Sequence, residues 1–271
     1  MKASINYILI GFAAICIMSC SPVLYSPVGQ NVPLFEERGE VALSAGICDS
    51  DVGFIYFGGN YASGFNVQDA AALTDKVAIT SSFYRMSGSP VNDADAAISG
   101  NGWHWEFSGG RYGAFQKKIF KWEILAGTGF GAIKNKIDND HLNLTYQKPF
   151  IQPSIAIKWK YVEFAFTSKL TLINYTTHDV SFSEVEKNDK AEAFFRDKRL
   201  SSAYEPGFTF RAGLRGIKLQ IQTCYTSFNY AGWSDRPAIN QLFTSLNVFY
   251  RFQSRKESPQ TVFVFKPSNH R

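Results

Sequence analysis

The two side chains best suited to acid–base chemistry are His104 and Glu106, two positions apart in the segment Trp103-His104-Trp105-Glu106. In a β-strand, residues two apart project from the same face, so the carboxylate could orient the imidazole as a general base. Ser108 continues that face and is the nearest hydroxyl that such a base could activate for acyl transfer. No more extensive catalytic motif surrounds these residues, so we assign no catalytic residue. A lipid acyl hydrolase or transferase that uses His104 stays as an alternative.

Charged side chains of both signs recur at alternate positions of otherwise apolar segments. They are Glu106, Glu123, Lys158, Glu163, Lys169, Arg211, Arg215, Lys218 and Arg251. If these positions face a narrow interior, the charges must be paired and hydrogen-bonded. We therefore expect an ion-pair network that plugs the interior, with Glu163 and Glu123 as candidate partners of Arg211 and Lys169. A conducting pathway is the alternative.

Metal chemistry has little support in the sequence. Asp138, Asn139, Asp140 and His141 are adjacent, but they lack the spacing of a calcium-binding loop, so we expect a polar loop and no metal site. The four cysteines include no C-x-x-C pair. Cys48 and Cys224 could form a disulfide in an oxidising compartment or remain free.

The elements that must position these residues have the period of β-strands. In the stretch from Ile217, apolar residues alternate with Lys218, Gln220 and Gln222, which places the two sets on opposite faces. Ten such segments occur: 40–48, 64–73, 76–86, 102–113, 119–132, 148–158, 161–175, 203–214, 217–229 and 242–252. The pattern predicts an all-β fold, an antiparallel up-and-down transmembrane β-barrel of about ten strands.

The connections between the segments alternate in length. Those at 74–75, 116–118, 159–160 and 215–216 are short, whereas the others are long and polar, the longest at 176–202. Bacterial outer-membrane barrels have short periplasmic turns and long outer loops, and an even strand number places both ends on one side. Phe, Tyr and Trp form 15% of the chain, which suits a lipid-facing surface with aromatic girdles that include Trp103 and Trp105. The net charge of +5 is scattered and predicts no nucleic-acid partner.

The first residues are typical of a secretory signal, with Lys2 before an apolar run from Tyr7 to Met18. The run ends in Ile17-Met18-Ser19-Cys20, which resembles the bacterial lipobox. We expect a signal peptide at 1–19, a lipidated linker at 20–39, a barrel at 40–252 and a basic periplasmic tail at 253–271. The lipid is a diacylglyceryl group with an acyl chain such as palmitate on Cys20, and no other cofactor is expected. An ordinary leader that contains a cysteine is the alternative.

No acidic residue follows Cys20 in Ser21-Pro22-Val23-Leu24-Tyr25-Ser26-Pro27. An aspartate next to the cysteine is associated with inner-membrane retention, and an acidic cluster with surface export. The sequence therefore predicts an anchor in the periplasmic leaflet of the outer membrane.

Several short motifs occur in order along the mature chain. They are Tyr25-Ser-Pro27, Asn31-Val-Pro-Leu34, Arg38-Gly-Glu40, Asn66-Val-Gln68, Ala70-Ala-Ala-Leu-Thr-Asp75, Phe150-Ile-Gln-Pro-Ser154, Glu205-Pro206 and Arg211-Ala-Gly213. In this order they resemble the Bacteroidota outer-membrane β-barrel lipoproteins. The resemblance implies a barrel in the outer membrane and no defined activity.

Four classes of protein stay open. The first is a non-enzymatic barrel, structural or accessory to an envelope protein complex, with outer-membrane lipids as further partners. A small pore or apolar-ligand-binding barrel is the second, and the lipid-modifying enzyme the third. The fourth, a soluble lipocalin-like lipoprotein, would turn the aromatic side chains inward, and the interleaved charges disfavour it.

Overall fold

The computed structural model describes residues 23–51, 62–93, 96–115, 119–137, 139–197, 200–214, 216–228, 238–239 and 242–253. The signal peptide, Cys20, Arg215 and the tail after residue 253 lie outside these ranges, so the expectations for them stay predictions.

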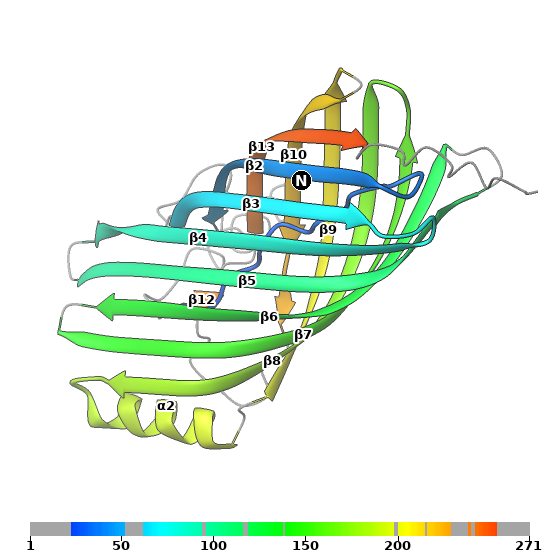
Figure 1. Ribbon diagram of the computed structural model, residues 1–271. Helices are drawn as coiled ribbons and strands as arrows, with labels where there is room; N and C mark the ends of the chain where they lie inside the picture. Colours follow the sequence, from blue (N-terminus) through cyan, green and yellow to red (C-terminus); the bar gives the residue numbers. More distant parts are fainter. Residues whose placement is uncertain are drawn as a thin grey trace, which may run out of the picture.

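Ten antiparallel strands form a closed wall (Figure 1). They are β2 (Glu40–Asp51), β3 (Ala62–Ala72), β4 (Val77–Asp93), β5 (Ala96–Ala114), β6 (Phe120–Ile137), β7 (Asp140–Lys158), β8 (Val162–Ser181), β9 (Leu200–Gly213), β10 (Ile217–Tyr225) and β13 (Leu242–Gln253). Each strand pairs with the next along the chain, and β13 pairs back with β2 to close the ring. The up-and-down barrel of about ten strands is thereby confirmed.

The strands β4 to β8 are longer than their hydrophobic pattern predicts. The segment expected at 148–158 begins at Asp140 as β7, and the one expected at 119–132 continues to Ile137 as β6. The added residues carry polar outward side chains such as Lys134 and Lys136, so the apolar alternation stops before the hydrogen bonding does. We call the end of the barrel with the long loops the long-loop end and the opposite end the short-turn end. At the long-loop end, the strands β4 to β8 therefore extend beyond the apolar surface.

The outer surface of the wall is apolar. Ile47, Leu170 and Val248 are each about half exposed or more, and so are outward side chains on every strand of the barrel. A continuous ring of this kind far exceeds the apolar patches that proteins expose to water. It has the character of a lipid-facing surface.

The chain enters the barrel before it builds the wall. Residues 23–35, here called the thread, begin with β1 (Val23–Tyr25) and continue without regular structure inside the ring. Leu24, Val28, Val32 and Phe35 of the thread are all at least 99% buried. In Figure 1 the dark-blue chain starts beside β12 (Ala238–Ile239) and runs within the strands to the start of β2.

The direction of the thread follows from its contacts along β7. Lys148, Gln152 and Lys158 of β7 bind Tyr25, Asn31 and Leu34 of the thread in that order. Because β7 runs from the long-loop end to the short-turn end, the thread runs the same way. Gly39 then donates to the carbonyl of Ala72 at the short-turn end, where β2 begins.

This course corrects two expectations. Within the linker predicted at 20–39, residues 24–35 lie in the lumen, and all of them except the partly exposed Ser26 are buried. The even strand count does not place both ends of the described chain on one side, because the thread adds one more crossing. Val23 lies at the long-loop end, where it pairs with Ala238, and Gln253 lies at the short-turn end beside Glu40.

The helix α2 (Val185–Asp197) closes part of the long-loop end. Its Phe194 and Phe195 contact the ring of Tyr175 of β8, and they share one apolar cluster with Leu24 and Tyr25 of the thread. Of the helices in the described residues, none is long and apolar enough to span a membrane. The aromatic side chains of the helix therefore extend the apolar cluster in which the thread begins.

Candidate functional site: the lumen and the thread

The first ion cluster lies nearer the long-loop end and is centred on Glu106 of β5. Its Oε1 lies 2.6 Å from Nζ of Lys169 and 2.9 Å from Nζ of Lys148. His104 Nε2 lies 3.0 Å from the same oxygen. The two ammonium groups reach it from β7 and β8, and both lysines are completely buried.

A second carboxylate, Glu205 of β9, balances the two lysines. Its Oε2 lies 3.7 Å from Nζ of Lys148 and 4.0 Å from Nζ of Lys169. Tyr25 of the thread donates its hydroxyl proton to Glu205 and accepts a hydrogen bond from Lys148 at 2.6 Å. Glu205 and Lys148 therefore hold the hydroxyl of Tyr25, and the two carboxylates balance the two ammonium groups, as buried charges require.

The second ion cluster lies nearer the short-turn end and is centred on Glu163 of β8. Its carboxylate lies 3.1 Å from Arg211 Nη1 and 2.8 Å from both Lys218 Nζ and Arg251 Nη1. Glu163 and Arg211 are each 1% exposed. The guanidinium of Arg211 also lies 3.9 Å from the ring centroid of Phe249. Three cations from three strands thus share one carboxylate.

The surplus positive charge is directed at the backbone of the thread. Arg211 Nη2 donates to the carbonyl of Val32 at 2.7 Å, and Arg251 Nη2 donates to that of Pro33 at 2.6 Å. Lys158 Nζ donates to the carbonyl of Leu34 at 2.9 Å. Hydrogen bonds from charged donors are stronger than neutral ones. The wall therefore supplies the thread with the partners that its carbonyls would have in a sheet.

Amide side chains continue this pattern toward the long-loop end. Gln222 Nε2 donates to the carbonyl of Gln30 at 2.6 Å, and Gln152 Nε2 donates to that of Asn31 at 2.8 Å. In return, Asn31 Nδ2 donates to the carbonyl of Asp69 in β3 at 2.8 Å. The carbonyls of residues 30–34, which lie beyond β1, thereby find hydrogen-bond partners, as buried backbone must.

Leu34 has a strained backbone at the point where the thread bends. Its φ angle is 54°, in the left-handed region that branched apolar residues rarely adopt. Its N–H donates to Glu123 Oε1 at 2.5 Å. Side chains on β6 and β7 therefore hold both backbone polar groups of Leu34, and such over-determination is what sustains a strained residue.

Glu36, the residue directly after the thread, forms ion pairs at the short-turn end. Glu36 Oε1 lies 3.0 Å from Lys158 Nζ and 3.4 Å from Lys121 Nζ, and its side chain is 47% exposed. Partial burial opposes ionisation of Glu36, but the ammonium groups of Lys158 and Lys121 outweigh it and hold its pKa below the ordinary value. Glu36 therefore binds as a carboxylate across the neutral range.

The fit between thread and wall leaves little space. A Cβ on Gly29 would lie 2.7 Å from Oε1 of Gln222 and 2.9 Å from the ring of Phe243, so the thread needs glycine there. A hollow of about 20 Å³ lies beside the thread between Val28 and Tyr146. That volume is about enough for one water molecule.

The contacts of His104 are structural. Its Nε2 contacts Glu106, whose carboxylate also binds two lysines, and its ring stacks on Tyr146 at a centroid distance of 5.6 Å. Ser108 Oγ lies 2.6 Å from Thr80 Oγ1, so this hydroxyl is paired with a neighbouring strand. His104 and Glu106 meet as their spacing predicts, but Ser108 does not complete a nucleophile–base pair with them.

The charged residues predicted for the lumen form three groups: the two ion clusters, and a pair of residues that bind the end of the thread. Glu106 and Lys169 belong to the first cluster, and Glu163, Arg211, Lys218 and Arg251 to the second. Lys158 and Glu123 bind the end of the thread. Of the pairs expected, Arg211 does bind Glu163, whereas Lys169 binds Glu106.

Sequence reasoning missed Lys148, Glu205 and the thread itself. Lys148 has the same alternation phase as Lys158, and Glu205 the same phase as Arg211, so period 2 alone could have found both. The thread has no periodic pattern that would mark it as buried.

Cys48 and Cys224 are buried and free. Both pack around Val28 of the thread in one apolar cluster. Among the described residues no group of histidine, cysteine and acidic side chains could hold a metal ion. Asp140 and His141, expected in a polar loop, instead begin strand β7, where His141 pairs with Asp179 at 3.2 Å and Asp140 accepts from Ser183.

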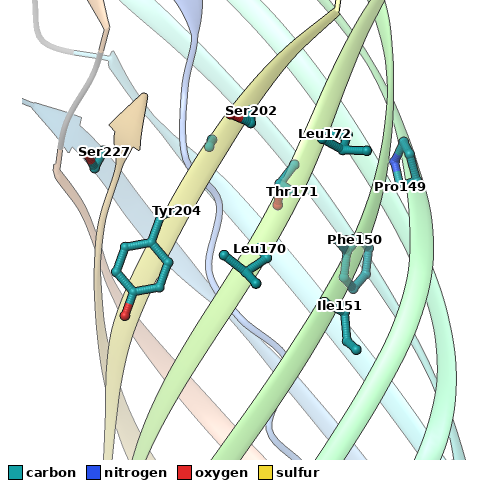
Figure 2. A pocket seen from close by; sticks show the side chains of 10 residues that line it. Pro149, Phe150, Ile151, Leu170, Thr171, Leu172, Ser202, Tyr204 and Ser227 are labelled. Atoms are coloured by element: carbon teal, nitrogen blue, oxygen red, sulfur yellow. The ribbon is translucent and has the colours of Figure 1, made fainter. Parts of the chain in front are cut away.

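The outer surface carries a shallow hollow of about 710 Å³ (Figure 2). Ile151 of β7, Leu170 and Leu172 of β8 and Tyr204 of β9 line it, with Ser227 of β11 (Ser227–Phe228) opposite Tyr204. It lies on the lipid-facing side of the wall, and no charged side chain lines it. Acid–base chemistry has no groups to use there.

The fold and the lumen define a closed ten-stranded membrane-type barrel filled by its own amino-terminal segment. No family model matches the sequence, and no curated protein matches it. Among solved structures, Ail, the attachment invasion locus protein of Yersinia pestis, is 13% identical over 79% of this chain and 99% of its own, with a TM-score of 0.36. CdiB from Acinetobacter baumannii is 7% identical over 79% of this chain, with a TM-score of 0.28; the alignment spans 60% of CdiB. At such TM-scores neither similarity carries an argument about function.

Proposed function

We propose that this protein is a non-enzymatic lipoprotein barrel of the outer membrane, structural or accessory to an envelope complex, whose lumen is sealed by the thread. The ring of exposed apolar side chains on the outside supports the membrane location, since closed barrels are the β-structures that lipid tolerates. Lipidation at Cys20 is supported by the lipobox-like Ile17-Met18-Ser19-Cys20.

The single observation that supports a sealed lumen is the burial of the thread between two ion clusters. Two lysines, two carboxylates and Tyr25 fill one level of the lumen, and Glu163 with its three cations fills another. An ion would have to displace these pairs, and breaking a buried pair costs about 3–5 kcal/mol. A permanently open pore therefore has no path along the thread.

Three experiments test the proposal. The purified full chain in planar lipid bilayers should give no steady conductance, and stable single-channel currents would overturn the sealed lumen. Extraction of membranes with carbonate in the absence of detergent should leave the chain in the pellet, and its release would contradict both the barrel in lipid and the anchor. An envelope partner should co-purify in mild detergent, and a chain that is isolated alone and is dispensable to envelope integrity would contradict the accessory role.

The lipid-modifying enzyme that uses His104 is the weaker candidate. His104 and Glu106 do meet, but Glu106 also neutralises Lys148 and Lys169, and the nearest hydroxyl on that face, Ser108, bonds to Thr80. A general base needs a substrate proton within hydrogen-bond reach. The pair is surrounded by buried wall and thread, which leaves no room for a lipid headgroup.

A further inference from the structure

We propose that the lipid on Cys20 is held at the long-loop end of the barrel, on the outer face of the membrane, with the thread passing through the lumen as its tether. The inference rests on the proposed function, since it takes Cys20 as lipidated and the long loops as external. It replaces the periplasmic leaflet, which the sequence alone favours.

The start of the thread is fixed at the long-loop end by three independent contacts. Val23 and Tyr25 pair with Ala238 and Ile239, which belong to the connection between the long-loop ends of β10 and β13. Tyr175 donates its hydroxyl proton to the carbonyl of Leu24 at 3.3 Å. Leu24 and Tyr25 also pack in one apolar cluster with Phe194 and Phe195 of α2.

Chain length then limits where the lipid can be. Cys20 precedes Val23 by three residues, and a fully extended chain spans at most about 3.6 Å per residue, or about 11 Å in all. The apolar band of an outer-membrane barrel is about 25 Å tall. Starting from Val23, the lipid cannot reach the leaflet at the short-turn end, but it can reach the leaflet at the long-loop end.

The alternative, in which the thread leaves the lumen so that Cys20 reaches the periplasm, would expose a large set of buried polar contacts. It would remove Tyr25 from Glu205 and Lys148, and it would remove the carbonyls of Val32 and Pro33 from Arg211 and Arg251. Buried charges left without partners are strongly destabilising. The contacts between wall and thread therefore favour a thread that remains in the lumen.

Three variants, each with one added cysteine, test the position of the anchor in intact cells with a membrane-impermeant maleimide. Pro22→Cys reports on the chain next to Cys20. Val185→Cys, at a 72% exposed residue of α2, marks the long-loop end, and Gln253→Cys marks the short-turn end. The unmodified chain, whose Cys48 and Cys224 are buried, supplies the background. Unheated gel migration confirms that each variant forms the barrel.

We expect Pro22→Cys and Val185→Cys to react fully in intact cells, and Gln253→Cys only after permeabilisation. If Pro22→Cys needs permeabilisation while Val185→Cys does not, the anchor faces the periplasm and the inference is wrong, although the barrel stands. A Pro22→Cys thiol that never reacts while both markers do would also contradict it. So would reversed markers, which would turn the long loops inward.

Lipid attachment is followed in parallel, so that the two proposals fail separately. Cells supplied with labelled palmitate should label the native chain, and Cys20→Ala should lose that label. No label on the native chain would overturn the lipoprotein proposal and the inference with it. A labelled chain with an inaccessible position 22 would overturn the inference alone.

Discussion

Arg211 of β9 donates a hydrogen bond of 2.7 Å to the carbonyl oxygen of Val32, 179 positions earlier in the chain. The same guanidinium binds Glu163 at 3.1 Å. The ion network of the lumen and the backbone of the thread are therefore one structure. The charged side chains inside the barrel bind the backbone of the thread as well as one another.

Removing the shared carboxylate should destabilise the barrel strongly. Glu163→Gln leaves Arg211, Lys218 and Arg251 buried without their anion, and we expect a loss of about 3–5 kcal/mol in the free energy of unfolding. Urea unfolding in detergent micelles, followed by tryptophan fluorescence, measures it. Glu192→Gln is the matched control, because Glu192 is half exposed and pairs only with His178 among the contacts described; it should lose at most about 1 kcal/mol. Equal losses for the two variants would contradict the role of Glu163.

A side chain at Gly29 should displace the thread. Val at position 29 would bring its Cβ within 3 Å of Gln222 and Phe243. We expect Gly29→Val to make the thread sensitive to added protease and to let intermittent current pass through the barrel in planar bilayers. Gly100→Ala, where the nearest atom to the new Cβ is 3.6 Å away, should behave as the native chain does. A protected, non-conducting Gly29→Val barrel would show that the fit at this position is unimportant.

The end of the thread should loosen in acid. Because Lys158 and Lys121 lower the pKa of Glu36 in the folded state, Glu36 adds stability above its unfolded pKa, which is about 4.3. That stability is lost as the pH falls through the lowered folded value. The native chain should therefore lose more stability than Glu36→Gln between about pH 6 and about pH 3, by well under 1 kcal/mol because Glu36 is half exposed. Parallel urea midpoints for the two chains across that range would argue against the pair.

Envelope lipids should not depend on Ser108. Ser108→Ala removes the hydroxyl that bonds to Thr80 and should cost about 1 kcal/mol of stability without altering the lipid profile measured by mass spectrometry. Thr80→Ala is the control, since it breaks the same hydrogen bond and leaves Ser108 in place. A lipid change in Ser108→Ala that Thr80→Ala lacks would revive the enzyme.

Much of the barrel could be predicted because its wall has a strict local period. Ile217, Leu219 and Ile221 face outward while Lys218, Gln220 and Gln222 face inward, as their alternation requires. The inward charges could be identified for the same reason, but their partners could not. Lys169 and Glu106 are 63 positions apart and meet only once strand register and closure are set.

The thread escaped prediction for the opposite reason. Residues 23–35 have no repeat, and their burial comes from side chains of distant strands, such as Gln152 at Asn31. Pro27, Gly29, Asn31 and Pro33 interrupt the segment with residues that are common in turns and exposed linkers. Its surroundings, and not its own sequence, decide that it is buried.

The closure of β13 on β2 has a consequence for the order of assembly. These two strands pair along twelve residues, from Leu242 with Asp51 to Gln253 with Glu40, and they form the last seam of the ring. A lumen this full leaves no path by which the thread could enter after the ring has closed. The thread must already lie in place when the final seam forms, so the barrel is expected to close around residues 23–35. The thread would then serve as the template around which the strands of the wall close.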